Sequence, residues 1–267
     1  YEHNLGQVTV EVDDKKIISK QAKLLNAAEV EKLGEPDKKI LKSVTKIEKH
    51  FQQYLGQVVA QSDKFLIGER AIARREECEL GNLITDALRW KSTADVAIIN
   101  GGGIRTSLPK GQITRGDIFA ILPFQNKLMK AEIDGKTLRE ALEHGVKFYP
   151  DAVGGFPQVS GLTFSFDCKK PEGQRTSEIF VDGKPLDENK IYTIAAPDFL
   201  FEGGDGYTML KDLKILAEFD TAENVLMEYL KKVGIKNVEV GRIKNLNVVP
   251  LPEDEAEKIE EVLRKNS

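Results

Sequence analysis

Short segments with the apolar spacing of strands alternate with segments that have the spacing of helices along most of this chain. The predicted elements are a strand at residues 57–62, a helix at 79–90, a strand at 95–99, a short helix at 115–121, a strand over KLMKAEI, a helix over GKTLREALEHGVKFY, a strand over LTFSFD, a hairpin through VDGKPL and a helix at 221–232. Because this order does not follow a strict βαβ repeat, it predicts an α+β (mixed α/β) fold. We expect a single compact domain with a mixed sheet and flanking helices.

Two further elements precede that domain. Residues 5–12, LGQVTVEV, place Val8, Val10 and Val12 on one face, which predicts a half-buried strand that DDKK connects to a second strand from Lys16. From Pro36, apolar residues recur at helical spacing for about 20 residues, a helix of roughly 30 Å. Such a helix is long enough to reach between two domains.

Composition and charge exclude several classes of protein. The net charge is −4 with a pI near 5.6, which argues against a general nucleic-acid or membrane-surface binder. The sequence has no run of 18 apolar residues, and its N-terminus lacks the pattern of a signal peptide. Two cysteines and three histidines lie scattered, without the spacing of metal ligands. Because the chain begins at Tyr1, we expect that it was processed or cut from a longer protein.

A glycine-rich segment, NGGGIR, follows the predicted strand at 95–99. Consecutive glycines allow backbone N–H groups to approach an anion closely, and Arg105 could add a charged fork. Taken alone, this segment is explained more simply as a tight strand exit. It does not match the dinucleotide-binding GxGxxG pattern, because Thr106 occupies the position of the third glycine.

Other segments carry residues that suit a nucleoside phosphate. LPFQN contains Phe124 and Asn126, and FLFEGGDGY contains Phe199 and Asp205. Aromatic rings could stack on a base, and a carboxylate could accept hydrogen bonds from ribose hydroxyls. Each phenylalanine taken separately would more simply be a core residue. Arg70 and Arg74, four residues apart, would by themselves suit a solvated face.

Together these segments resemble the C-terminal, substrate-binding domain of the 5'-nucleotidase family, which includes periplasmic UDP-sugar hydrolases and ecto-5'-nucleotidases. The resemblance rests on RREECELGNLITDALRW, on the segment from NGGGIR to ALEHG, and on FLFEGGDGYTML, in the family's order. It extends from Gly68 to Leu210, with a weaker continuation to Asn245.

The resemblance implies a set of substrate-binding residues. Arg70, Arg74 and Arg105 would hold the phosphate, Asn100 and the backbone of Gly101, Gly102 and Gly103 would shape the site, Phe124 and Phe199 would sandwich the base, and Asn126 and Asp205 would face the base edge or ribose. It assigns no role to Glu143 or His144, which we expect to be packing or surface residues. It assigns no catalytic and no metal-binding residue to this chain.

Enzymes of the family also carry an N-terminal metallophosphoesterase domain that binds two divalent metal ions, and its Asp, His and Asn motifs have no counterpart here. The resemblance thus implies four segments: 1–34, the closing hairpin of that domain; 35–56, the interdomain linker helix; 57–250, the substrate-binding domain; and 251–267, a charged helical tail. That N-terminal domain and a nucleotide or nucleoside are the expected partners.

The expected function is binding of the nucleotide that a longer hydrolase cleaves, with this chain alone inactive. The parent would cleave nucleoside 5'-monophosphates or related nucleotides outside the cytoplasm, in the periplasm, at the cell surface or after secretion, and would carry a signal peptide. A stand-alone nucleotide-binding module, or a parent that acts on cyclic nucleotides or nucleotide sugars, remains open.

Overall fold

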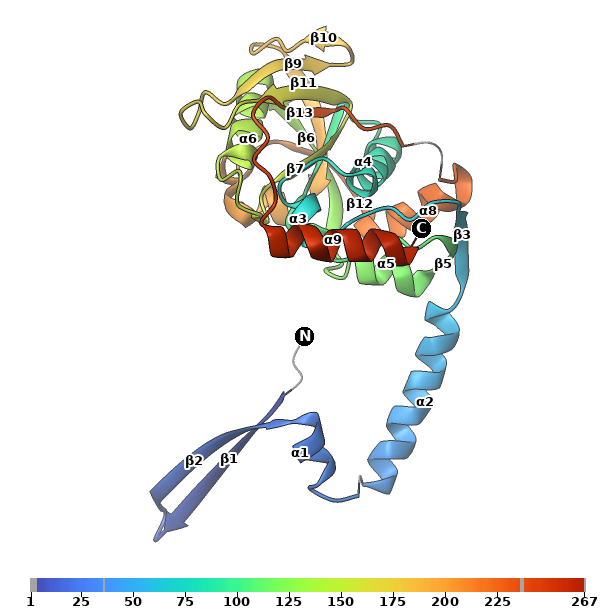
Figure 1. Cartoon of the computed structure of the whole chain (residues 1–267), viewed down its shortest axis with the longest axis vertical. Helices are drawn as coiled ribbons and strands as arrows, with labels where there is room; N and C mark the ends of the chain where they lie inside the picture. The colour runs from blue at the N-terminus through green and yellow to red at the C-terminus, as the bar shows by residue number, and fades with distance from the viewer. Residues whose placement is uncertain (1–3, 36, 236–237, 267) are drawn as a thin grey trace. The chain divides into compact units, whose positions relative to one another are not determined.

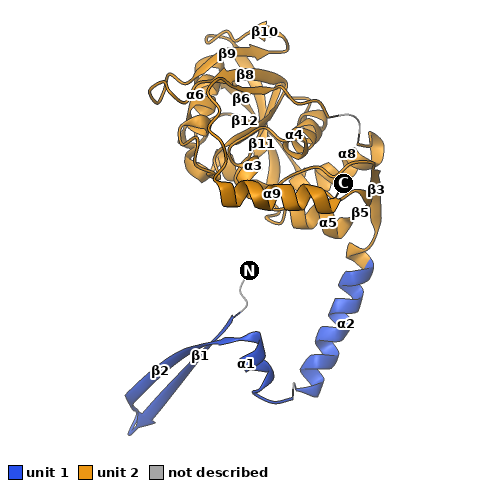
Figure 2. Ribbon diagram, in the orientation of Figure 1, with its two compact units in different colours: residues 1–53 blue, residues 54–267 orange. Residues whose placement is uncertain are grey.

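The computed structural model describes residues 4–35, 37–235 and 238–266, and the chain divides into two units, residues 1–53 and 54–267 (Figure 2). Unit 1 contains β1 (Asn4–Asp13), β2 (Lys16–Asn26), α1 (Ala27–Glu31) and most of α2 (Lys38–Leu55). The predicted hairpin and long helix are therefore confirmed, although Pro36, where the helix was expected to begin, lies outside the described residues.

The hairpin exposes the face that was expected to be half-buried. Val8, Val10 and Val12 are 66%, 44% and 59% exposed. The prediction of burial is wrong for this chain, because the described residues of unit 1 provide no second layer over that face. Among them, Leu25 is the only buried residue.

Unit 2 is a mixed α/β domain, as predicted (Figure 1). Its first half contains β3 (Val58–Ser62), α3 (Arg70–Ala73), α4 (Glu79–Ser92), β4 (Val96–Asn100), η1 (Gly101–Gly103), β5 (Gly111–Thr114), α5 (Arg115–Ile121), β6 (Lys127–Asp134) and α6 (Gly135–Val146). Its second half contains β7 (Pro157–Ser160), β8 (Leu162–Phe166), β9 (Thr176–Val181), β10 (Lys184–Pro185), β11 (Ile191–Pro197), α7 (Asp198–Phe201), η2 (Gly204–Gly206), η3 (Thr208–Leu210), β12 (Ile215–Thr221), α8 (Ala222–Lys232), β13 (Ile243–Asn245) and α9 (Glu253–Asn266).

The central sheet has five strands in the order β12-β6-β11-β4-β7. Strands β11 and β4 are parallel, whereas the other neighbouring pairs are antiparallel. A four-stranded sheet, β10-β9-β8-β13, and the pair β3-β5 complete the domain. Strand β4 lies between β11 and β7, and Asn100 at its carboxyl end pairs with Pro157 of β7.

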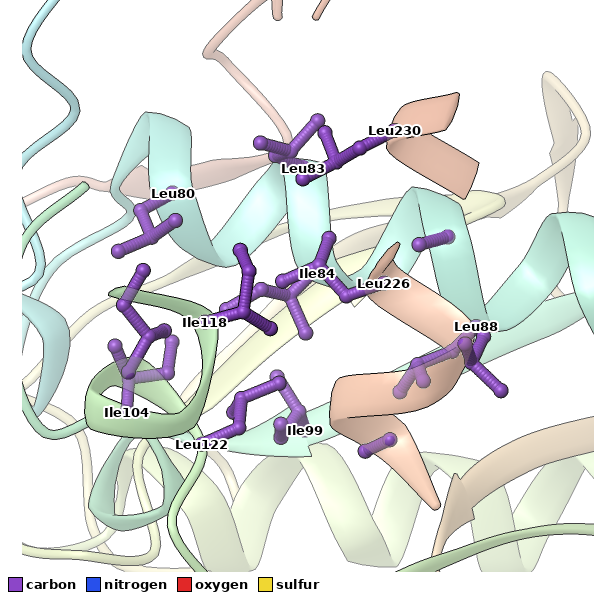
Figure 3. Close-up of a cluster of buried hydrophobic side chains, with 14 of the residues drawn as sticks. Leu80, Leu83, Ile84, Leu88, Ile99, Ile104, Ile118, Leu122, Leu226 and Leu230 are labelled. Carbon is purple, nitrogen blue, oxygen red and sulfur yellow. The ribbon is translucent and has the colours of Figure 1, made fainter. Parts of the chain in front are cut away.

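The two faces of β4 pack into two different hydrophobic cores. Ala97 and Ile99 join the core formed with α4, α5 and α8, whereas Val96 and Ile98 join the core that contains residues of α6. Figure 3 shows Ile99 in the first of these cores, among leucine and isoleucine side chains that include Leu122. Burying each such side chain contributes about 1.5–3 kcal/mol, so the end of β4 is a rigid platform.

Arginine and tyrosine side chains anchor the segment that leads to α9. The Arg75 guanidinium is 3% exposed, donates to the Val249 carbonyl and lies 5.2 Å from the centroid of the Tyr149 ring. The Tyr149 hydroxyl accepts the Val249 N–H at 2.8 Å. The predicted charged helix follows as α9, apart from Ser267, which lies outside the described residues. Within the described part of the chain, we find no helix whose length and apolarity would let it cross a bilayer.

Candidate functional site

A cleft of about 420 Å³ opens at the carboxyl end of β4. It is lined by Arg74, Asn100, Gly102, Gly103, Arg105, Phe124, Asn126, Gly154, Phe199 and Asp205. All the predicted site residues except Arg70 and Gly101 are among them, and Gly154 was not predicted. Segments that are far apart in the sequence thus meet at the end of one buried strand.

Two of the three glycines after β4, Gly101 and Gly102, allow other backbone segments to approach closely. A Cβ atom on Gly101 would lie 2.0 Å from the Ala73 carbonyl oxygen, and one on Gly102 would lie 2.9 Å from Gly154 Cα. The Gly101 and Gly102 N–H groups donate to the carbonyls of Phe156 and Gly154, at 2.7 and 2.8 Å. The idea that these two N–H groups form an anion nest is therefore wrong. Instead, these hydrogen bonds connect η1 to the segment at residues 154–156.

Two arginine side chains, those of Arg74 and Arg105, line the cleft. Burial lowers the pKa of Arg74, and the positive charges of Arg105 and Arg70 lower it further, while Asp205 has the opposite effect. The Arg74 Nε atom is buried and has no hydrogen-bond partner among the described residues. Arg70 is exposed and does not line the cleft, but its charge reaches Arg74. An anion bound here would relieve this repulsion and give Arg74 an acceptor.

Two aromatic side chains provide flat surfaces in the same cleft. Phe124 is 49% exposed, and the Arg105 guanidinium lies 5.7 Å from the centroid of its ring. Phe199 is half-buried and its ring covers Gly204, where a Cβ atom would lie 2.4 Å from Phe199 Cζ. Rings that line a cleft can stack on a planar ligand, whereas the rings of fully buried core residues cannot.

The loop that carries Asp205 is fixed from several directions. Asp205 Oδ2 accepts a hydrogen bond from Asn100 Nδ2 at 2.6 Å, and the Asp205 backbone has a positive φ of 50°. His144 Nε2 lies 2.8 Å from the Asp205 carbonyl oxygen, and the His144 ring packs edge-on against Tyr207, with centroids 4.8 Å apart. The Asp205 carboxylate is therefore oriented before any ligand binds.

Sequence reasoning missed two residues that build this site. Gly154 lies against Asp205, because a Cβ atom there would be 2.7 Å from Asp205 Oδ2. The adjacent glycines at 154–155 were the available signal. His144 packs, as expected, but it also holds the Asp205 loop, and nothing in its neighbouring sequence indicates this contact. Glu143 is a buried packing residue that accepts the N–H groups of Arg175 and Thr176.

Comparison with known proteins places this geometry in a family. The family model described as "5'-nucleotidase, C-terminal domain" matches residues 58–212. The trifunctional nucleotide phosphoesterase protein YfkN of Bacillus subtilis is 31% identical over 92% of this chain and 18% of its own length. The 5'-nucleotidase of Bos taurus is 32% identical over 90% of this chain and 46% of its own length.

A solved structure gives the same result. The 5'-nucleotidase precursor of Thermus thermophilus is 33% identical, with a TM-score of 0.72 over 92% of this chain and 50% of that chain. The chain thus spans half or less of the length of these relatives. It belongs to the 5'-nucleotidase family and contains the C-terminal domain of that family.

Proposed function

We propose that this chain is the nucleotide-binding part of a 5'-nucleotidase-type phosphoesterase. The observation that carries the proposal is the cleft itself, which combines two arginines, two phenylalanine rings and one oriented carboxylate. Arginine forks suit a phosphate, aromatic faces suit a base, and a carboxylate suits ribose hydroxyls. The names of the relatives, which describe nucleotidases and a nucleotide phosphoesterase, support the same class of ligand.

Each predicted side chain has a place in this proposal. Arg74 and Arg105 bind the phosphate, with the charge of Arg70 adding to the field. Phe124 and Phe199 stack on the two faces of the base. Asp205 Oδ2 accepts a hydrogen bond from Asn100, and Asp205 Oδ1 accepts one from a ribose hydroxyl. Asn126 faces the base edge.

Hydrolysis would require groups that we do not find here. Among the residues that the structure describes, no cluster of three or more His, Cys, Asp or Glu side chains is arranged to hold a metal ion. The two divalent ions of a metallophosphoesterase site do not fit this donor set, so we derive no hydrolytic step from these residues. We propose that the remainder of a longer protein holds those ions and performs the reaction.

The exposed apolar surfaces of unit 1 support such an arrangement. In the hairpin and in α2, apolar side chains are exposed that a folded domain would normally cover: Leu5, Val8, Val10, Val12, Ile17, Ile18, Leu24, Ile40, Leu41, Val44, Ile47 and Phe51. We propose that the hairpin completes the preceding metallophosphoesterase domain of the parent and that α2 links the two domains. We also propose that the parent acts outside the cytoplasm, and the name of one relative, snake venom 5'-nucleotidase, supports this.

Calorimetric titration with adenosine tests the proposed base site. We expect Phe124→Ala to weaken adenosine binding about fivefold to tenfold, near the lower end of the range for stacking on one aromatic ring. Because Phe124 is 49% exposed, its loss should leave the thermal unfolding midpoint nearly unchanged. Phe199→Ala should weaken binding at least as much.

Phe148→Ala is the matched control, because Phe148 is 47% exposed and lies outside the residues that line the cleft. It should bind adenosine like the wild type. The base site would be refuted if both cleft variants bound adenosine normally, or if Phe148→Ala weakened binding as much as they do.

A further inference from the structure

A small recess adjoins the cleft. Its volume is about 10 Å³, close to the space that one water molecule needs. It shares Asn100, Gly103, Phe124 and Asn126 with the cleft. The remaining wall has four apolar residues, Ile99, Leu122, Pro197 and Ala222, and two polar ones, Gln125 and Glu223.

Two hydrogen-bond acceptors at this recess lack donors. Glu223 is 2% exposed, and its Oε2 atom has no hydrogen-bond partner among the described residues. Asn100 is 3% exposed, and its Oδ1 atom is likewise buried without a partner in that part of the chain. The Asn100 Nδ2 group donates to Asp205, which fixes the amide so that Oδ1 is left as the acceptor. Buried acceptors without donors are costly, so the recess suits a ligand that donates twice.

The position of the recess indicates which ligand group would supply the donors. Phe124 and Asn126 line both the recess and the cleft, and the proposed function places the face and the edge of a base at these residues. The backbone N–H of Ala222, next to Glu223, donates to the Asn126 carbonyl at 2.8 Å, so the start of α8 is fastened to this part of the cleft. An exocyclic amino group is similar in size to water and has two N–H donors.

We propose that Glu223 is a specificity-determining residue that accepts a hydrogen bond from the exocyclic amino group of the bound base. Asn100 Oδ1 accepts the second N–H of that group. Where Glu223 is ionised, a keto oxygen in the same place would face two acceptors and would be disfavoured. Because burial raises the pKa of Glu223, this preference should weaken as the pH falls and the carboxyl gains a proton that it can donate. This inference rests on the proposed nucleotide-binding function, and it adds a preference for amino-bearing over keto-bearing bases.

The test compares nucleosides that differ at one position of the base. We expect the wild-type chain to bind adenosine about fivefold to tenfold more tightly than purine riboside, which lacks the amino group, and to bind inosine most weakly. Glu223→Gln should lower the ratio of adenosine affinity to purine riboside affinity to about twofold, because a neutral amide oxygen is a weaker acceptor than a carboxylate. Binding of purine riboside itself should change less than twofold.

Glu228→Gln is the matched control. Glu228 lies on the same helix, pairs with Lys91 and Lys232, and lines neither the recess nor the cleft. It should keep the wild-type ratio. A wild-type ratio in Glu223→Gln would overturn the inference, and the recess would then be a water site alone.

A second measurement needs no variant and covers the case in which Glu223→Gln fails to fold. N6,N6-dimethyladenosine, which has no N–H on that nitrogen, should bind the wild type at least tenfold more weakly than adenosine. Equal binding of the two nucleosides would contradict the inference. If no nucleoside binds at all, it is the proposed function that fails, whereas an insensitive ratio with normal binding refutes only the role of Glu223.

Discussion

Gly101→Ala should lower the free energy of unfolding by ~3 kcal/mol, because the added methyl group would overlap neighbouring atoms. A Cβ atom on Gly101 would lie 2.0 Å from the Ala73 carbonyl oxygen and 2.8 Å from its carbonyl carbon. Both are backbone atoms, so no side-chain rotation relieves the overlap. In a domain of this size, such a loss lowers the thermal midpoint by roughly 6–12 °C, which circular dichroism would measure.

The control for this prediction is a glycine with room for a methyl group. Gly116 lies in α5, and the atoms nearest to a Cβ there are 3.5 Å away. Gly116→Ala should be neutral or stabilising by up to about 1 kcal/mol, since alanine favours helix. If both variants kept the wild-type midpoint, the close approach of the glycine loop to Ala73 would not exist in solution.

Arg105→Ala should weaken binding of AMP by about tenfold to a hundredfold while adenosine binding stays within about threefold of the wild type. The estimate follows from the loss of hydrogen bonds between a charged guanidinium and a phosphate, which contribute about 1.5–3 kcal/mol. The expected result depends on the phosphate because Arg105 and Arg74 both line the cleft and the positive charge of Arg105 acts on Arg74. Parallel titrations with AMP and adenosine would separate the phosphate from the nucleoside.

Arg139→Ala supplies the comparison, because Arg139 pairs with Glu188 on the surface and lines no part of the cleft. It should leave both affinities unchanged. An Arg105→Ala protein that lost AMP and adenosine binding to the same extent would show that Arg105 supports the fold of the cleft rather than the phosphate. Its thermal midpoint, expected to match the wild type, gives an independent check.

Much of the fold follows from local patterns that the sequence states directly. The alternation over KLMKAEI became β6, and the apolar face of GKTLREALEHGVKFY became the buried face of α6. The hairpin formed as expected, but its face is exposed because burial depends on a partner layer that local spacing cannot specify. The order of strands in the central sheet was not predicted, since period and composition carry no information on which strands become neighbours.

The same distinction applies to the site. Residues in recognisable motifs, such as Arg105, Phe124 and Asp205, were predicted and lie together. His144 contacts Asp205, and Glu223 lines a recess together with Asn100. These segments lie far apart in the sequence, so local patterns do not predict that they meet. Arg70 was predicted to hold the phosphate, yet it is exposed and influences the cleft through its charge.

The central claim is that this chain binds a nucleotide and does not hydrolyse it, and ³¹P NMR of AMP tests both parts in one sample. With the chain present and Mg²⁺ or Zn²⁺ added, we predict that the AMP resonance shifts or broadens and that no orthophosphate signal appears. Arg105→Ala should leave the AMP resonance closer to its free position, which separates specific binding from viscosity. Orthophosphate that accumulates with the wild type and not with Arg105→Ala would contradict the account, as would an AMP resonance that the chain leaves unchanged.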